Sequence, residues 1–122
     1  MSGKSRIFAL DFNKGKHMSD QQKIDSIRNA VRQLAPPHSR AILYGSRARG
    51  DARRDSDWDI LILVNKPKAE MSDFDNLSFP LTELGWECNA SIIPVVYGQS
   101  EWDHPSSLLF RKNVERDAVE LV

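Results

Sequence analysis

The stretch LYGSRARGDARRDSDWDILILV, residues 43–64, joins two apolar segments through a segment that is rich in charge. Four arginines and four aspartates lie between the apolar ends: Arg47, Arg49, Arg53, Arg54, Asp51, Asp55, Asp57 and Asp59. The last two aspartates run directly into the aliphatic residues 60–64, which are typical of a buried strand. Carboxylates at the start of a buried strand, soon after a Gly-Ser turn, indicate a binding site at the end of that strand.

The two aspartates that begin the strand are predicted to share one face. Alternate residues of a strand point to the same side, so Asp57 and Asp59 point one way while Trp58 and Ile60 point into an apolar core. The carboxylates are then separated by two strand steps, roughly 6–7 Å along the backbone. They can converge on one or two divalent cations, and Mg²⁺ prefers oxygen ligands of this kind together with phosphates.

A phosphate site is predicted immediately upstream of the aspartates. Gly45 allows a tight turn and a close approach of the backbone to a ligand. Ser46 begins a short helix expected over residues 46–53, where free N–H groups and the helix dipole favour an anion. Arg47 and Arg49 can contact phosphate, or can form surface ion pairs with the nearby aspartates. A phosphate pocket beside a pair of metal ligands is what transfer from a nucleoside triphosphate requires.

Helices alternate with strands along the chain. We expect helices over residues 19–34, 46–53, 69–84 and 105–116, and strands over residues 40–44, 57–64, 86–97 and 118–122. Pro36 and Pro37 end the first helix, Pro80 interrupts the third, and Gly85 ends it. This alternation predicts an α/β fold in which helices cover a sheet.

Composition restricts the class of protein. The chain has 122 residues, which suits one domain, and its 17 basic residues equal its 17 acidic residues, so direct binding of nucleic acid is not expected. Its single cysteine, Cys88, cannot form an intrachain disulfide, which fits the cytoplasm. No apolar run approaches the ~20 residues that a membrane-spanning helix needs, so no membrane partner is expected.

The beginning of the chain differs from the rest. Met18 stands just before a helix start, and the residues ahead of it contain only a short apolar patch. We interpret residues 1–17 as a leader or mobile tail and residues 18–122 as the domain; a short native strand over residues 6–10 is the alternative.

The segment GSRARGDARRDSDWDILILV resembles the signature of the minimal nucleotidyltransferases, the small members of the DNA polymerase β-like superfamily. The shared pattern is Gly-Ser, ten residues, then Asp-x-Asp running into an aliphatic strand, and the wider resemblance covers about residues 19–122. It implies the nucleotidyltransferase fold, a small mixed β-sheet flanked by helices. It also implies Mg²⁺ on Asp57 and Asp59, and triphosphate contacts from Gly45 and Ser46.

The same resemblance implies a reaction and a partner. A nucleoside monophosphate would move from a nucleoside triphosphate to a hydroxyl of a protein or small molecule, with release of pyrophosphate. Small members of the family are often encoded beside a helical HEPN protein, and some act as its antitoxin. A homo-oligomer is a further possibility, since little of the chain remains after the sheet is built. The rival interpretation is a catalytically weak or inactive binding module that acts through a helical partner.

The sequence departs from the family at the third carboxylate. Active members carry an acid on the next strand, facing the aspartate pair, and the candidate strand here is WECNASIIPVVY. The family position falls on Ser91, or on Asn89, and neither residue is acidic. Glu87 is acidic and is expected on the same strand face, so it is the alternative third ligand.

Overall fold

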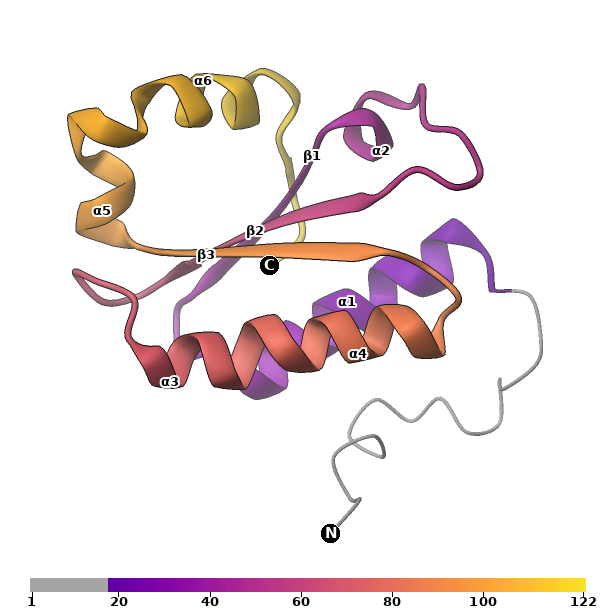
Figure 1. The fold of residues 1–122 in the computed structure, drawn as a ribbon, viewed down its shortest axis with the longest axis horizontal. Helices are drawn as coiled ribbons and strands as arrows, with labels where there is room; N and C mark the ends of the chain where they lie inside the picture. Colours follow the sequence, from indigo (N-terminus) through magenta and orange to yellow (C-terminus); the bar gives the residue numbers. More distant parts are fainter. Residues whose placement is uncertain (1–17) are drawn as a thin grey trace, which may run out of the picture.

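The computed structural model describes residues 18–122 (Figure 1). The predictions for residues 1–17, a tail or a short strand, lie outside the described residues. The elements in chain order are α1 (Asp20–Leu34), β1 (Arg40–Tyr44), α2 (Ser46–Arg49), β2 (Trp58–Val64), α3 (Met71–Asp73), the π-helix η3 (Phe74–Ser78), α4 (Phe79–Glu87), β3 (Ile92–Gly98), α5 (Gln99–Asp103), the 3₁₀-helix η4 (Pro105–Ser107), α6 (Leu108–Asp117) and β4 (Val119–Glu120).

The four strands form one mixed sheet in the order β3-β2-β1-β4. Strand β1 pairs antiparallel with β2 and β4, whereas β2 pairs parallel with β3. Strand β2 is therefore internal, and its segment Ile60–Val64 is buried throughout. The expected α/β fold, a small mixed sheet flanked by helices, is confirmed.

Helices cover both faces of the sheet. Helix α1 and the long helix ending in α4 lie together on one side, and α5 and α6 lie on the other (Figure 1). The α1 and α4 side holds the larger core, which includes Trp58, Ile60 and Ile62. The opposite side packs Leu61 and Leu63 against residues of α5 and α6. The alternation predicted for β2 therefore holds, because its successive side chains enter different cores.

The long helix passes through Pro80, contrary to the predicted interruption. It extends over three segments from α3 to α4, and the π-turn η3 lies directly before the segment that contains the proline. Proline lacks an N–H and clashes with the preceding turn of a regular α-helix. The wider π-turn relieves this clash and places Pro80 in the first turn of α4, where its missing N–H is tolerated.

The predicted end of that helix at Gly85 is wrong. The helix continues to Glu87 and stops where Asn89 adopts a positive φ of 56°. Gly85 has a different role, because the backbone of Ala90 packs closely against it. The Ala90 N–H donates to the Gly85 carbonyl at 2.8 Å, and a Cβ at residue 85 would lie 2.9 Å from the Ala90 oxygen. The strand predicted from residue 86 consequently begins only at Ile92.

Two further elements are shorter than predicted, and one helix was not predicted. Helix α2 ends at Arg49 rather than at residue 53, because Gly50 takes the left-handed conformation at φ 87°. Strand β4 is limited to Val119–Glu120. Helix α5 follows β3 directly and was not predicted, since no apolar periodicity marks its five residues.

The carboxylate of Glu101 fixes the entry to α5. Its Oε1 accepts hydrogen bonds from the backbone N–H groups of Ala69 and Gly98, both at 2.9 Å. These two backbone bonds lower the pKa of Glu101 below its ordinary value. One side chain therefore ties the start of α5 to the loop before α3.

We expect Glu101→Gln to lower the melting temperature at about pH 7, because the neutral amide accepts the same hydrogen bonds more weakly. A depressed folded-state pKa contributes stability above the unfolded-state pKa, and this contribution is lost as the pH falls through the folded-state pKa. The difference between variant and parent should therefore shrink under acid conditions. Melting curves across this pH range check it, with the exposed Glu115→Gln as control. A pH-independent difference would contradict the role of the charge.

Candidate active site

The predicted glycine and one predicted aspartate meet at one end of the two central strands. Strand β1 ends where β2 begins, and Tyr44 pairs with Asp59 in the antiparallel register. Gly45 follows with a φ of 77°, which favours glycine. A Cβ at this position would clash with the Asp59 carboxylate. The turn after β1 therefore places bare backbone against an acidic oxygen.

A pocket of about 180 Å³ opens at this contact. It is lined by Tyr44, Gly45, Arg49, Asp59, Asn113, Arg116 and Asp117. The last three residues come from the C-terminal half of α6, and the sequence analysis did not identify them. The ring of Phe110 packs edge-on against Tyr44 at 5.6 Å between centroids, which holds α6 over the end of β1. No short-range pattern in the sequence indicates this contact.

The carboxylates of the pair repel each other in the ligand-free protein. Burial raises the pKa of Asp59, and the nearby charge of Asp57 raises it further, while Arg49 acts in the opposite direction. Burial and the Asp59 charge together raise the pKa of Tyr44 to about 12. Burial is the larger cause of both shifts, and the smaller contribution of a neighbouring carboxylate is one that a bound cation would offset.

An ion-pair network borders the pocket on the α6 side. The Asp117 carboxylate accepts hydrogen bonds from Arg49 at 3.1 Å and Arg116 at 3.4 Å, and Arg49 also reaches Asp51 at 3.3 Å. Burial alone would raise the pKa of Asp117, but the two guanidinium groups lower it overall. The network joins α2 to α6 and leaves two guanidinium groups on the lining of the pocket.

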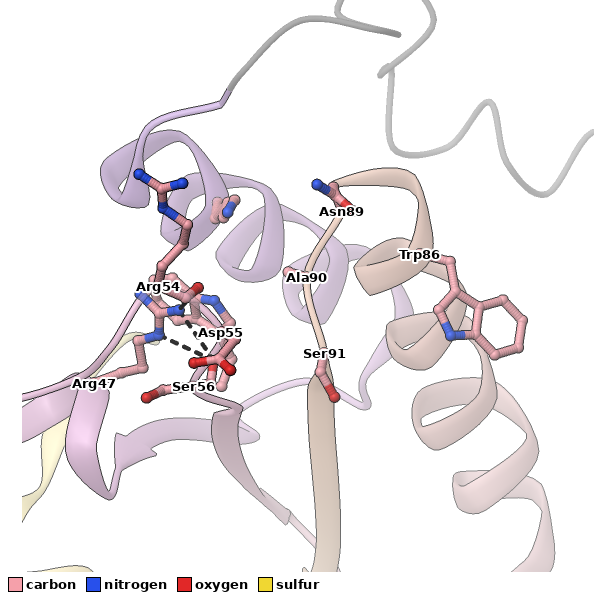
Figure 2. Close-up of a pocket in the computed structure, with 10 residues that line it drawn as sticks. Arg47, Arg54, Asp55, Ser56, Trp86, Asn89, Ala90 and Ser91 are labelled. Atoms are coloured by element: carbon pink, nitrogen blue, oxygen red, sulfur yellow. Dashed lines mark hydrogen bonds between the residues drawn. The ribbon is translucent and has the colours of Figure 1, made fainter.

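Arg47 is committed to the loop before β2. Its Nη2 donates to the carbonyls of Arg54 and Ser56, both at 3.0 Å (Figure 2). Its guanidinium carbon lies 4.5 Å from the centre of the Trp58 ring. Only 8% of its side chain is exposed. Arg47 lines a second pocket rather than the one at Gly45. Its contacts therefore hold the loop that leads into the aspartate pair.

The remaining predicted residues are not among those that line the pocket at Gly45. Ser46 is the half-buried first residue of α2, and Asp57 is exposed directly before β2. Ser91 lines the second pocket and precedes β3. Glu87 ends helix α4, so the strand-face argument that made it a third ligand fails. In the parallel register, the residue beside Asp59 is Ile93.

The acidic residues present fit a divalent cation that is shared with a ligand. Within residues 18–122 there is no group of three His, Cys, Asp or Glu side chains that could hold a metal ion. Asp57 and Asp59 supply two carboxylates, and Mg²⁺ is commonly bound through one or two carboxylates plus substrate phosphates and water. The mutual repulsion of the pair favours such a cation.

Comparison with known proteins identifies the family. The nucleotidyltransferase domain family matches residues 24–119, more than half of the chain. The chain belongs to this family. The resemblance drawn from the signature at residues 45–64 is thereby confirmed.

A solved structure, described as the crystal structure of a toxin-antitoxin with AMP-PNP, is similar to the chain with a TM-score of 0.60 and 19% identity. The alignment covers 85% of this chain and 73% of that one, and it supports the nucleotidyltransferase fold. No curated protein matches the chain. In the part of the chain that the structure describes, no helix has the length and apolar character needed to cross a membrane.

We expect Gly45→Ala to destabilise the protein more than Gly50→Ala. Gly50 has the left-handed conformation, which costs an alanine about 1–2 kcal/mol, whereas Gly45, at φ 77° and ψ −159°, lies in a region that is nearly restricted to glycine and costs an alanine about 1–3 kcal/mol. Only at residue 45 does the added Cβ meet the Asp59 carboxylate, whereas the Cβ at residue 50 has open space. Urea unfolding of each variant measures the difference.

The Asp59→Ala background tests the same contact. Removing the carboxylate should lower the cost of Gly45→Ala to its backbone part alone, so the double-mutant cycle should be strongly non-additive. Additive costs would show that residues 45 and 59 do not touch.

Proposed function

We propose that the protein is a metal-dependent nucleotidyltransferase that moves a nucleoside monophosphate from a nucleoside triphosphate to a hydroxyl of a protein or small molecule. The observation that supports it best is the close approach of the Gly45 backbone to the Asp59 carboxylate at the end of the two central strands. A backbone free of side-chain atoms and an acid that needs a cation are the two components of a triphosphate site. Membership of the nucleotidyltransferase family agrees with this assignment.

Each residue has a distinct part in this proposal. Gly45 and Ser46, at the first turn of α2, contact the triphosphate. Asp57 and Asp59 would hold Mg²⁺, which when bound supplies neutralisation of phosphate charge. Arg49 and Arg116, on the lining of the pocket, offer cations to the phosphates. Arg47 acts indirectly, since its guanidinium already binds the loop carbonyls.

We place the protein in the cytoplasm with a helical partner of the HEPN type. The similar solved structure is described as a toxin-antitoxin with AMP-PNP, which motivates both a nucleotide and a protein partner for this chain. Exposed apolar side chains on α6 and the long helix give a partner or a second copy a surface to bury; they include Met71, Phe79, Trp86 and Leu109. The acceptor hydroxyl would then belong to the partner.

A second candidate function is a catalytically weak binding module. Strand β3 carries no acid beside the aspartate pair, because its first residues are Ile92 and Ile93 and Ser91 precedes them. A partner would be held without nucleotide transfer. Release of pyrophosphate distinguishes the two functions.

We expect Asp57→Asn and Asp59→Asn each to abolish Mg²⁺-dependent release of pyrophosphate from a nucleoside triphosphate. Either change removes one of the two charges that a shared cation requires. Asp55→Asn is the matched control, since this exposed aspartate precedes the pair and should leave the rate unchanged. Calorimetry with ATP and Mg²⁺ measures binding separately from turnover. Full Mg²⁺-dependent nucleotide binding in both variants would remove the metal-site assignment.

The third-carboxylate position is tested by Ser91→Asp and Ile93→Asp. We propose residue 91 from its place in the sequence, whereas the strand register favours residue 93, the partner of Asp59. The variant that faces the pair should tighten Mg²⁺ binding and raise any transfer rate. Without metal it should lower the melting temperature as the carboxylates ionise with rising pH. If neither variant gains from Mg²⁺, β3 does not contribute to the metal site.

A further inference from the structure

A second pocket, larger than the one at Gly45, lies at the same end of the sheet. Its volume is about 360 Å³, and its lining consists of Lys23, Arg47, Arg54, Asp55, Ser56, Trp58, Trp86, Asn89, Ala90 and Ser91. Trp58 and Asp59 are successive residues of β2, so their side chains point to opposite faces. The two pockets therefore lie on opposite sides of the start of β2, and the proposed transferase function does not account for the second one.

The lining of this second pocket is polar and converges from three parts of the chain. The loop residues Arg54, Asp55 and Ser56 stand on one side of the gap and Asn89, Ala90 and Ser91 on the other, while the Trp86 ring points away (Figure 2). Both sides are fixed: Arg47 binds the loop carbonyls, and the backbone N–H of Trp58 donates to the Ser91 carbonyl at 2.8 Å. The pocket is preformed rather than dependent on loop closure.

The charges of this lining favour an anion. Three basic side chains face one acid, Asp55. Arg47 donates to loop carbonyls and pairs with Asp20 at 3.5 Å, but within residues 18–122 neither Lys23 nor Arg54 forms an ion pair. Two unpaired cations at a preformed pocket are suited to a phosphate group.

The other polar groups favour a sugar. Asp55 can accept hydrogen bonds from hydroxyl groups, and Asn89 and Ser91 can both donate and accept. The indole N–H of Trp58 is a buried donor with no partner in the described part of the chain, and Trp58 is 2% exposed. Such a donor is unfavourable until an oxygen accepts its hydrogen bond. A pocket of this volume suits a small ligand.

We propose that this second pocket binds a sugar phosphate, with Lys23 and Arg54 on the phosphate and Asp55, Asn89 and Ser91 on the hydroxyl groups. Because the site lies across β2 from Asp59, binding there requires neither Mg²⁺ nor the Gly45 pocket. The net positive lining also excludes a polycationic ligand.

Titration of the ¹⁵N-labelled full chain with ribose 5-phosphate, without Mg²⁺, tests the proposal by nuclear magnetic resonance. The indole signal of Trp58 and the side-chain amide of Asn89 should shift saturably. The indole signal of Trp102 should not shift, since Trp102 belongs to the core on the other side of the sheet. Ribose at the same concentration should bind at least tenfold more weakly, because it lacks the phosphate.

Matched variants locate the phosphate. Arg54→Ala and Lys23→Ala should each weaken binding of ribose 5-phosphate at least tenfold, whereas Arg53→Ala, the adjacent exposed arginine outside the lining, should not. Equal losses for Arg53→Ala and Arg54→Ala, or no saturable shift at Trp58, overturn the proposal.

Asp59→Asn should leave this binding intact while it abolishes Mg²⁺-dependent ATP binding. Loss of both in Asp59→Asn would place the pocket within the nucleotide site and overturn the inference of a separate one.

Discussion

The burial of β2 on both faces is the constraint on which the site depends. Residues 60–64 have apolar cores on both faces and a neighbouring strand on each side. The pairing register of β2, and the face to which each side chain points, therefore cannot change without exposing a core. Asp59 lies in the same strand, directly before Ile60. The direction in which its side chain points therefore follows from the burial of the residues after it. The energy that places the carboxylate therefore comes from hydrophobic packing, and the site need not supply it.

That placement has an electrostatic cost. Asp59 is half-buried beside Asp57, and the pKa of Asp59 rises because both burial and the neighbouring charge disfavour its ionised form. The arginines at the pocket do not cancel this cost, since Asp117 and Asp51 take up the guanidinium of Arg49. Under the proposed function, a ligand that brings a divalent cation would gain from relieving the repulsion, and the phosphates of the same ligand would compete for Arg49. We therefore expect the cation and the anion to bind better together than separately.

Local rules predicted the elements that are governed by local patterns. Ser19 caps α1 as expected: its side chain accepts from the Gln22 backbone N–H, and the Gln22 side chain accepts from the Ser19 backbone N–H. The aliphatic residues of β2 form a strand. The rule that proline ends a helix fails at Pro80, because it assumes α-geometry and the chain inserts a π-turn instead. The rule for Gly85 fails because a tertiary contact with Ala90, rather than the helix end, requires a glycine there.

The residues of the site also differ in how far local sequence patterns could predict them. Gly45 and Asp59 are joined by a hairpin-like pair of strands, and their contact could be predicted from spacing and strand parity alone. Asn113, Arg116 and Asp117 could not, because the packing of Phe110 against Tyr44 and Tyr97 brings them to the pocket from a helix far along the chain.

The residue of β3 that lies beside Asp59 depends on where β3 begins. A strand that begins at residue 92 rather than 86 removes Glu87 from the sheet and sets Ile93 beside Asp59. Ser91 precedes the strand and lines the second pocket, whereas Ile93 is the residue that the register sets beside Asp59. Ile93 is 41% exposed and supplies no ligand there. In the proposed metal site, affinity without a third acid would depend on oxygens that the nucleotide or the acceptor brings, so metal binding would be coupled to substrate binding more tightly than in a site with three acids of its own.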